Sequence, residues 1–307
     1  MEKKKKKRMI WGIILGLLAV FAVWVAWTNL HITVSPYEIE NPKLPVEFDG
    51  YKIAQISDLH NRNWGEKLLD PLRKEKPDLI VITGDLTDSR HEDFDLVLKF
   101  LKEALKIAPV YYVTGNHEAW MENYPVLAEK MEKTGVQMLD DKAVFLEKGD
   151  ARVNLIGLAD PDFTERDSSV HEAIIEKKME SLIKKDEYNL VLCHRPELFS
   201  AYEAGGADLV LTGHAHGGQI RLPFLGAVYA PNQGFFPRYT AGVYRSGGTD
   251  MVVSRGLGNS VLSVRFNNTP ELVTVILRTP ESLGTQCAHG TPFLSPVQTH
   301  ATAADPL

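Results

Sequence analysis

The most informative stretch of the chain reads Val110-Tyr111-Tyr112-Val113-Thr114-Gly115-Asn116-His117-Glu118. Its first five residues are β-branched or aromatic, which is typical of a short buried strand. A glycine, an amide, an imidazole and a carboxylate follow without a gap. Because open α/β sheets build their ligand sites just beyond the carboxyl ends of their strands, this stretch predicts an α/β protein with a polar site at a sheet edge.

Strand and helix patterns alternate through this half of the chain. The predicted strand and helix pairs are residues 52–57 with 66–75, 79–83 with 93–106, and 110–114 with 125–133. The helix over 93–106 carries its apolar residues at the spacing of an amphipathic helix. This succession predicts β-α-β units and a largely parallel sheet.

The second half of the chain is richer in strand patterns. Residues 143–147 and 152–157 flank Lys148-Gly149-Asp150, which predicts a hairpin. Further apolar runs of strand type cover 189–193, 209–212, 251–254 and 272–277. We therefore expect two sheets packed face to face, with helices on the outside.

The first thirty residues form a separate unit. A basic run over residues 3–8 precedes residues 9–30, which carry no charge and have Trp11, Trp24 and Trp27 near their ends. A membrane span needs about 20 apolar residues, and interfacial tryptophans mark its ends. A cleaved signal peptide is the alternative, but no small-x-small cleavage site follows the apolar run. Because basic flanks stay in the cytoplasm, we expect a single-pass cell-membrane protein with an extracytoplasmic domain.

The remaining boundaries follow from proline content and composition. We expect a tether over residues 31–48, one domain over 49–279, and a disordered tail over 280–307. The chain has a net charge of −6, of which residues 1–8 contribute +5, so the remainder carries −11. Such an acidic domain is a poor ligand for duplex nucleic acid. Two cysteines cannot form a disulfide framework.

Strongly polar residues follow one predicted strand after another. The five places are Asp58-Leu59-His60, Gly84-Asp85, Gly115-Asn116-His117-Glu118, Cys193-His194 and Gly213-His214-Ala215-His216. Taken alone, each has an ordinary explanation as a helix cap, a turn or a hydrogen-bonded core histidine. Together they form a nitrogen and oxygen ligand set without a thiolate, which suits Mn, Fe, Zn or Co. The set exceeds what one ion needs and predicts two divalent ions about 3.5–4 Å apart.

This ordered series of D-x-H, G-D, G-N-H-E, a single H and G-H-x-H resembles that of the calcineurin-like metallophosphoesterase superfamily across nearly all of residues 51–277. Residues 213–223 resemble its bacterial membrane-associated branch. The resemblance implies a four-layer α/β/β/α sandwich. It also implies that Asp58, His60 and His216 hold the first metal, that Asp85 bridges, and that Asn116, His194 and His214 hold the second.

The resemblance gives His117 a catalytic role, in which it faces the substrate and protonates the leaving oxygen. Asp88 matches the aspartate that pairs with this histidine in the related Ser/Thr phosphatases. In those enzymes an arginine that holds phosphate follows directly, whereas here Arg90 is displaced by one residue, so we do not assign it to phosphate. Arg195 and Arg221 lie near candidate ligands in the sequence, and a solvated surface role is equally open for each.

The expected function is hydrolysis of a phosphomonoester, phosphodiester or pyrophosphate by in-line attack of a metal-bound hydroxide. A substrate from the membrane or the cell wall fits the expected location. A narrower alternative is a lipid-linked pyrophosphate hydrolase, which exposed apolar residues beside the site would favour, with Trp64, Trp120 and Phe235-Phe236 as candidates. A non-catalytic protein-binding scaffold is the alternative from another class, but it predicts gaps in the ligand series, and none is visible. The oligomeric state stays open.

Overall fold

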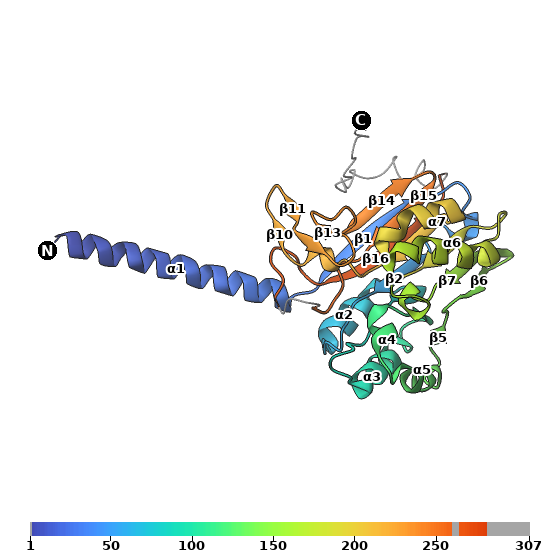
Figure 1. Ribbon diagram of the computed structural model, residues 1–307, viewed down its shortest axis with the longest axis horizontal. Helices are drawn as coiled ribbons and strands as arrows, with labels where there is room; N and C mark the ends of the chain where they lie inside the picture. Colours follow the sequence, from blue (N-terminus) through green and yellow to red (C-terminus); the bar gives the residue numbers. More distant parts are fainter. Residues whose placement is uncertain (1, 260–263, 281–307) are drawn as a thin grey trace.

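A computed structural model describes residues 2–259 and 264–280, and it shows a long N-terminal helix that projects from a layered α/β domain (Figure 1). The helix, α1 (Glu2–Leu30), is long enough over Lys4–Leu30 to cross a membrane and contains an 18-residue window with a mean hydropathy of 2.5. The domain packs none of this apolar window into its interior. Except for Pro280, the tail predicted over 280–307 lies outside the described residues.

The first sheet has six strands, and its middle is parallel as predicted. In spatial order they are β1 (Thr33–Glu40), β16 (Glu271–Arg278), β2 (Lys52–Ile56), β3 (Leu79–Thr83), β4 (Val110–Val113) and β5 (Gln137–Met138). Strands β2 to β5 run parallel because helices connect them: α2 (Glu66–Glu75), α3 (Phe94–Ala104) and α5 (Tyr124–Glu132). Strand β16 is antiparallel to β2, so the complete sheet is mixed.

The second sheet also has six strands, and two helices cover it. In spatial order the strands are β14 (Gly242–Ser246), β15 (Thr249–Val253), β9 (Leu209–Thr212), β8 (Asn189–Leu192), β7 (Ala151–Gly157) and β6 (Lys142–Lys148). The predicted hairpin is β6 with β7, which pair antiparallel. The connecting helices are α6 (His171–Leu182), between β7 and β8, and α7 (Phe199–Gly205), between β8 and β9.

The apolar side chains form three core layers, which confirms the four-layer sandwich. Alternate residues of a central strand belong to different layers: Ile80 of β3 packs under α2 and α3, while Val81 packs between the sheets. In β8, Leu190 faces the layer between the sheets and Val191 faces α6 and α7. Each central strand is therefore buried on both faces, which explains its continuous apolar sequence.

The tether predicted for residues 31–48 is wrong as a structural assignment, because Thr33–Glu40 forms the edge strand β1. This strand pairs in parallel with β16, with Thr33 opposite Glu271 and Glu40 opposite Arg278. Pro36 made the segment resemble a connector. An edge strand tolerates proline because the outer side of the strand needs no N–H donor.

Two short hairpins follow β9 and lie on the side of the domain where α1 ends (Figure 1). The first pairs β10 (Arg221–Leu222) with β11 (Gly226–Ala227), and the second pairs β12 (Tyr229–Ala230) with β13 (Gly234–Phe235). The sequence patterns did not predict these strands of two residues each.

Candidate metal centre

The candidate ligands meet in one buried cluster at the edge where the two sheets adjoin. The first sheet supplies Asp58 and His60 after β2, Asp85 after β3, and Asn116 at the start of α4 (Asn116–Trp120). The second sheet supplies His194 after β8, and His214 and His216 after β9. All seven side chains are buried. The structure therefore brings the side chains that follow these strand ends together in one place.

The first group of potential ligands contains Asp58, His60, Asp85 and His216, whose ligand atoms lie within 4.8 Å of one another. The Nε2 atoms of His60 and His216 are 3.2 Å apart. His216 Nε2 lies 3.2 Å from Asp58 Oδ1, and His60 Nε2 lies 3.6 Å from Asp85 Oδ2. Two imidazole nitrogens and two carboxylate oxygens at this spacing can hold one cation.

The second group shares Asp85 with the first. His194 Nε2 lies 3.2 Å from the same Asp85 Oδ2 and 3.2 Å from His214 Nδ1. Asn116 adds an amide oxygen, Oδ1, that is buried and has no hydrogen-bond partner among the described residues. Because buried polar atoms are almost always satisfied, this oxygen calls for an explanation, and a cation beside it would provide one. The residues present therefore fit divalent metal ions, and Asp85 belongs to both ligand groups.

Hydrogen bonds to oxygen atoms fix which nitrogens of the second group are free to bind metal. His194 Nδ1 lies 2.7 Å from the Thr83 carbonyl oxygen, and His214 Nε2 lies 3.0 Å from Asn232 Oδ1. Both oxygens accept, so these nitrogens carry the ring protons. In the neutral rings, His194 Nε2 and His214 Nδ1 are left with lone pairs, which is how metal-binding histidines are usually oriented.

Burial and close charges shift the pKa values within the cluster in both directions. Burial raises the pKa of Asp58 to about 6 and lowers the pKa of His60 to about 3. Burial also opposes ionisation of Asp85, yet the imidazoles of His194 and His117 hold its pKa well below the ordinary value. Bound cations would favour anionic carboxylates and neutral imidazoles at all of these positions. Such perturbed groups are typical of functional sites.

The backbone at the ligands adopts an unusual conformation. Asp58, His60, Asp85, His214 and His216 all have positive φ, between 47° and 62°. For residues other than glycine this region is uncommon and costs about 1–3 kcal/mol each where the surroundings enforce it. A neighbouring glycine makes room for this packing, since a Cβ atom on Gly84 would lie 2.6 Å from His194 Nδ1. The fold therefore holds these side chains in strained turns that aim them at one point.

Glu118 organises the half of the site that the first sheet supplies. Its buried carboxylate accepts hydrogen bonds from the backbone N–H groups of Gly115 at 2.7 Å, Asp85 at 2.9 Å and Thr87 at 3.1 Å. Burial raises the pKa of Glu118 to about 7. Sequence reasoning included this residue in a motif but gave it no role, although a glutamate directly after the polar triplet was the available signal.

Arg195 organises the half that the second sheet supplies, so a solvated surface role for it is wrong. Its side chain is 2% exposed, and Nε and Nη2 donate to the carboxylate of Asp160 at 2.6 and 2.8 Å. Its Nη1 donates to Asn232 Oδ1 at 3.0 Å, and this is the oxygen that also contacts His214. Asp160 is 35 residues away in sequence, so no local pattern carried this signal. The other arginine in question, Arg221, is half-buried and donates to the Gly217 carbonyl at 3.0 Å.

His117 lies beside the cluster with Asp88 and Ser89 at one ring nitrogen. His117 Nδ1 accepts a hydrogen bond from the backbone N–H of Ser89 at 3.1 Å, so the proton of the neutral ring is on Nε2. Asp88 Oδ1 is 3.5 Å from the same Nδ1, but both Asp88 oxygens also accept from Arg90 at 3.2 Å. Arg90 therefore forms an ion pair with Asp88.

The expectation that Trp64 is an exposed apolar residue beside the site is wrong, because its side chain is buried in the core under α2. Trp120 is 43% exposed, and its ring lies 5.1 Å from that of His117. Phe235 and Phe236 are 74% and 68% exposed. The surface near His117 and the surface of the second hairpin therefore both carry exposed aromatic rings.

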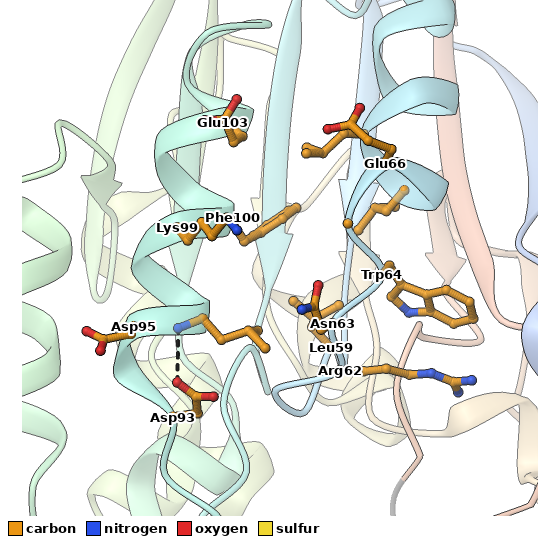
Figure 2. A pocket seen from close by; sticks show the side chains of 14 residues that line it. Leu59, Arg62, Asn63, Trp64, Glu66, Asp93, Asp95, Lys99, Phe100 and Glu103 are labelled. Carbon is orange, nitrogen blue, oxygen red and sulfur yellow. Dashed lines mark hydrogen bonds between the residues drawn. The ribbon is translucent and has the colours of Figure 1, made fainter.

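A cavity of about 730 Å³ lies apart from this centre, between α2 and α3 (Figure 2). Its lining combines apolar side chains such as Phe100 with charged residues such as Lys99 and Glu103. None of the seven candidate ligands lines it, so the metal chemistry is not located there. Arg62, at its edge, lies over the ring of Trp64 at 4.1 Å.

A four-layer sandwich that gathers carboxylates, imidazoles and an amide at the adjoining edges of its sheets defines the metallophosphoesterase class. The chain belongs to the calcineurin-like phosphoesterase family, whose model matches residues 51–218. It is therefore a hydrolase that acts on phosphate esters.

Its relatives include bacterial and vertebrate proteins. The metallophosphoesterase YkuE of Bacillus subtilis is 27% identical over 299 residues, covering 91% of this chain and 99% of YkuE. The phosphodiesterase YaeI of Escherichia coli is 28% identical over 241 residues, covering 74% of this chain and 82% of YaeI. A transmembrane protein with a metallophosphoesterase domain from Danio rerio is 24% identical over 279 residues, covering 87% of this chain and 61% of that protein.

Proposed function

We propose that this protein is a two-metal phosphoesterase anchored by α1 in the cell membrane, with its catalytic domain outside the cytoplasm. One observation carries the two-metal assignment: Asp85 Oδ2 lies 3.6 Å from His60 Nε2 of one ligand group and 3.2 Å from His194 Nε2 of the other. The unpartnered Asn116 oxygen supports it independently.

In this proposal, Asp58, His60 and His216 would hold the first ion, Asn116, His194 and His214 would hold the second, and Asp85 would contribute to both. Two bound ions of Mn, Fe, Zn or Co would polarise the phosphoryl group. They would also lower the pKa of water, so that hydroxide would be available at neutral pH to attack the phosphorus. His117 acts as the general acid. In its imidazolium form the ring passes the Nε2 proton to the leaving oxygen and returns to neutral imidazole. Asp88, 3.5 Å from Nδ1, stabilises the ring when it is charged.

The location and the substrate are also proposed. The length and hydropathy of α1 support a membrane anchor, and the basic run before it supports a cytoplasmic N-terminus. The substrate is then a phosphomonoester, phosphodiester or pyrophosphate of the membrane or the cell wall. The exposed ring of Trp120 near His117 favours the narrower alternative, a lipid-linked pyrophosphate hydrolase.

A direct test is hydrolysis of nitrophenyl phosphate and bis-nitrophenyl phosphate by the purified full-length protein with added Mn²⁺. We expect release of nitrophenol from one ester or both, and about two metal ions per chain by elemental analysis. If neither ester is hydrolysed at any metal loading, the non-catalytic scaffold becomes the better reading.

The topology has its own test. Protease added to intact cells or protoplasts should digest the catalytic domain. Degradation only after lysis would show that the orientation is reversed.

A further inference from the structure

The two short hairpins after β9 expose several large apolar side chains. We call this the apolar hairpin surface; it comprises Leu222, Phe224, Leu225, Tyr229, Phe235 and Phe236. Phe224, at the tip of the first hairpin, is fully exposed. Exposed groups of large apolar residues are unusual on soluble domains and mark sites of interaction.

The contacts of α1 show what lies near this surface. Phe266 packs against Phe21 and Trp24 of α1, with ring centroids 5.9 and 5.4 Å apart. At a rise of 1.5 Å per residue, these two positions lie about 9–14 Å before the end of α1 at Leu30. Phe266 therefore sits beside the apolar part of the helix and not beyond its end.

Two sets of hydrogen bonds join this part of the domain to α1 and to the hairpins. Asn29 Nδ2 donates to the Arg265 carbonyl, and the Arg265 N–H donates to Asn29 Oδ1, both at 2.8 Å. The Phe266 carbonyl accepts from the Arg221 N–H at 3.0 Å, at the start of β10. The first hairpin thus begins on the segment that packs against the apolar end of α1, as their common side in Figure 1 shows.

We infer that the apolar hairpin surface docks on the bilayer that α1 spans. Aromatic side chains are favoured at the membrane–water interface, and apolar groups on peripheral elements enter it by about 5–10 Å. A bilayer that surrounds α1 at the level of Trp24 reaches the domain surface around Phe266. The exposed rings on the adjoining hairpins then exchange water for lipid at this interface.

The docking surface is continuous with the metal centre. The second hairpin carries Tyr229 and Phe235, whose rings pack at 5.5 Å, and its turn contains Asn232. Asn232 Oδ1 lies 3.0 Å from His214 Nε2. The rings of this one hairpin therefore face the lipid, while its turn contacts a candidate metal ligand. Resting on the proposed function, this arrangement gives the substrate class: phosphate esters of lipids, taken up with the phosphate at headgroup level.

Docking can be measured by fluorescence in the full-length protein, reconstituted in vesicles of phosphatidylethanolamine and phosphatidylglycerol. Cys287 is replaced by serine, and the buried Cys193 stays. An environment-sensitive NBD label is then attached to Phe224→Cys or, as the control, to Val126→Cys. Val126 is an apolar residue of α5 that is 49% exposed. We expect nitroxide-labelled lipids to quench the label at 224 at least twofold and to leave the label at 126 unchanged. Equal, weak quenching at both positions would overturn the docking.

The substrate class is tested with two esters that share one leaving group, methyl nitrophenyl phosphate and hexadecyl nitrophenyl phosphate. Phe224→Asp should leave the rate on the soluble methyl ester unchanged and lower the rate on the membrane-bound ester by about tenfold, whereas Val126→Asp should alter neither. Unchanged rates on both esters in Phe224→Asp would overturn uptake from the bilayer. A parent protein that hydrolyses neither ester, and releases no nitrophenol from the monoester nitrophenyl phosphate either, would instead contradict the proposed function, while the quenching result would still decide the docking.

Discussion

The two sheets contribute different chemistry to the metal centre. The first supplies two carboxylates, an amide, one imidazole ligand and the candidate acid His117, and the buried carboxyl group of Glu118 organises its loops. The second supplies only imidazoles, and a buried cation, Arg195, donates to the Asn232 oxygen that contacts one of them, His214. Neither sheet holds a complete ligand group, because His216 crosses to the first group and Asp85 to the second. The site therefore depends on how the sheets pack, as well as on each loop.

The most severe test of this division is Asp85→Asn. The substitution removes the negative charge between the two groups and leaves a weak neutral donor in its place. We expect metal content to fall at both positions together and hydrolysis to fall by more than about 10³-fold, a loss in the range caused by removing a central catalytic group.

Elemental analysis of three variants decides the matter. Asp58→Asn and Asn116→Ala should each weaken mainly one position, since they lie in different groups. Undiminished occupancy of both positions in Asp85→Asn would refute the bridging role.

His117→Ala should separate chemistry from metal binding within the first-sheet half. Both metals should remain, and activity on esters with poor leaving groups should fall by about 10²–10⁴-fold, the usual size of general-acid catalysis. A nitrophenyl ester should be affected less, because its leaving group needs no proton. Asp88→Asn should lower activity in the same way but by a smaller factor. Loss of metal in His117→Ala would contradict its assignment as acid.

Arg195→Met tests the organiser of the second-sheet half. It leaves the buried carboxylate of Asp160 without its partner, and breaking one side of a buried ion pair costs about 3–5 kcal/mol. We expect a clear drop in the thermal unfolding midpoint together with weaker metal binding at the His194 and His214 group.

Lys133→Met is the matched control, because Lys133 pairs with Glu129 on the surface of the molecule, and it should leave the midpoint unchanged. Equal effects of the two substitutions would mean that Arg195 has no organising role.

The smallest effect is expected for Asn232→Ala. This substitution removes the oxygen that contacts both His214 and Arg195, and loss of such an orienting partner typically costs at least about tenfold in metal affinity. Titration of metal-depleted protein should show weaker binding at the position that contains His214 and unaltered binding at the other. A loss at the other position alone would contradict the grouping of His214 with Asp85 and His194.

Much of the fold, and the clustering of the candidate ligands, could be predicted because each depends on local sequence. Strands such as β3 and β9 are short apolar runs buried on both faces, and a glycine with polar residues ends each one. A few adjacent residues therefore suffice to predict the position of a candidate ligand after a strand.

The features that could not be predicted depend on distant partners. Strand β1 exists because β16 pairs with it, and its own sequence alternates with polar residues around Pro36. The burial of Arg195 depends on Asp160, and the roles of Glu118 depend on how three backbone segments meet. The short strands of the apolar hairpin surface have too few residues for any periodicity.

The pairing of β1 with β16 has a consequence for synthesis. Arg278 at the end of β16 donates to Glu38 of β1 across 240 residues of chain. At the usual translation rate of about 5–20 residues per second, β1 emerges about 12–48 s before its partner. During that interval the chain carries an unpaired strand edge, which is open to wrong pairing. A nascent chain arrested before Glu271 should therefore be cleaved by protease within the first sheet, and a chain extended beyond Arg278 should resist.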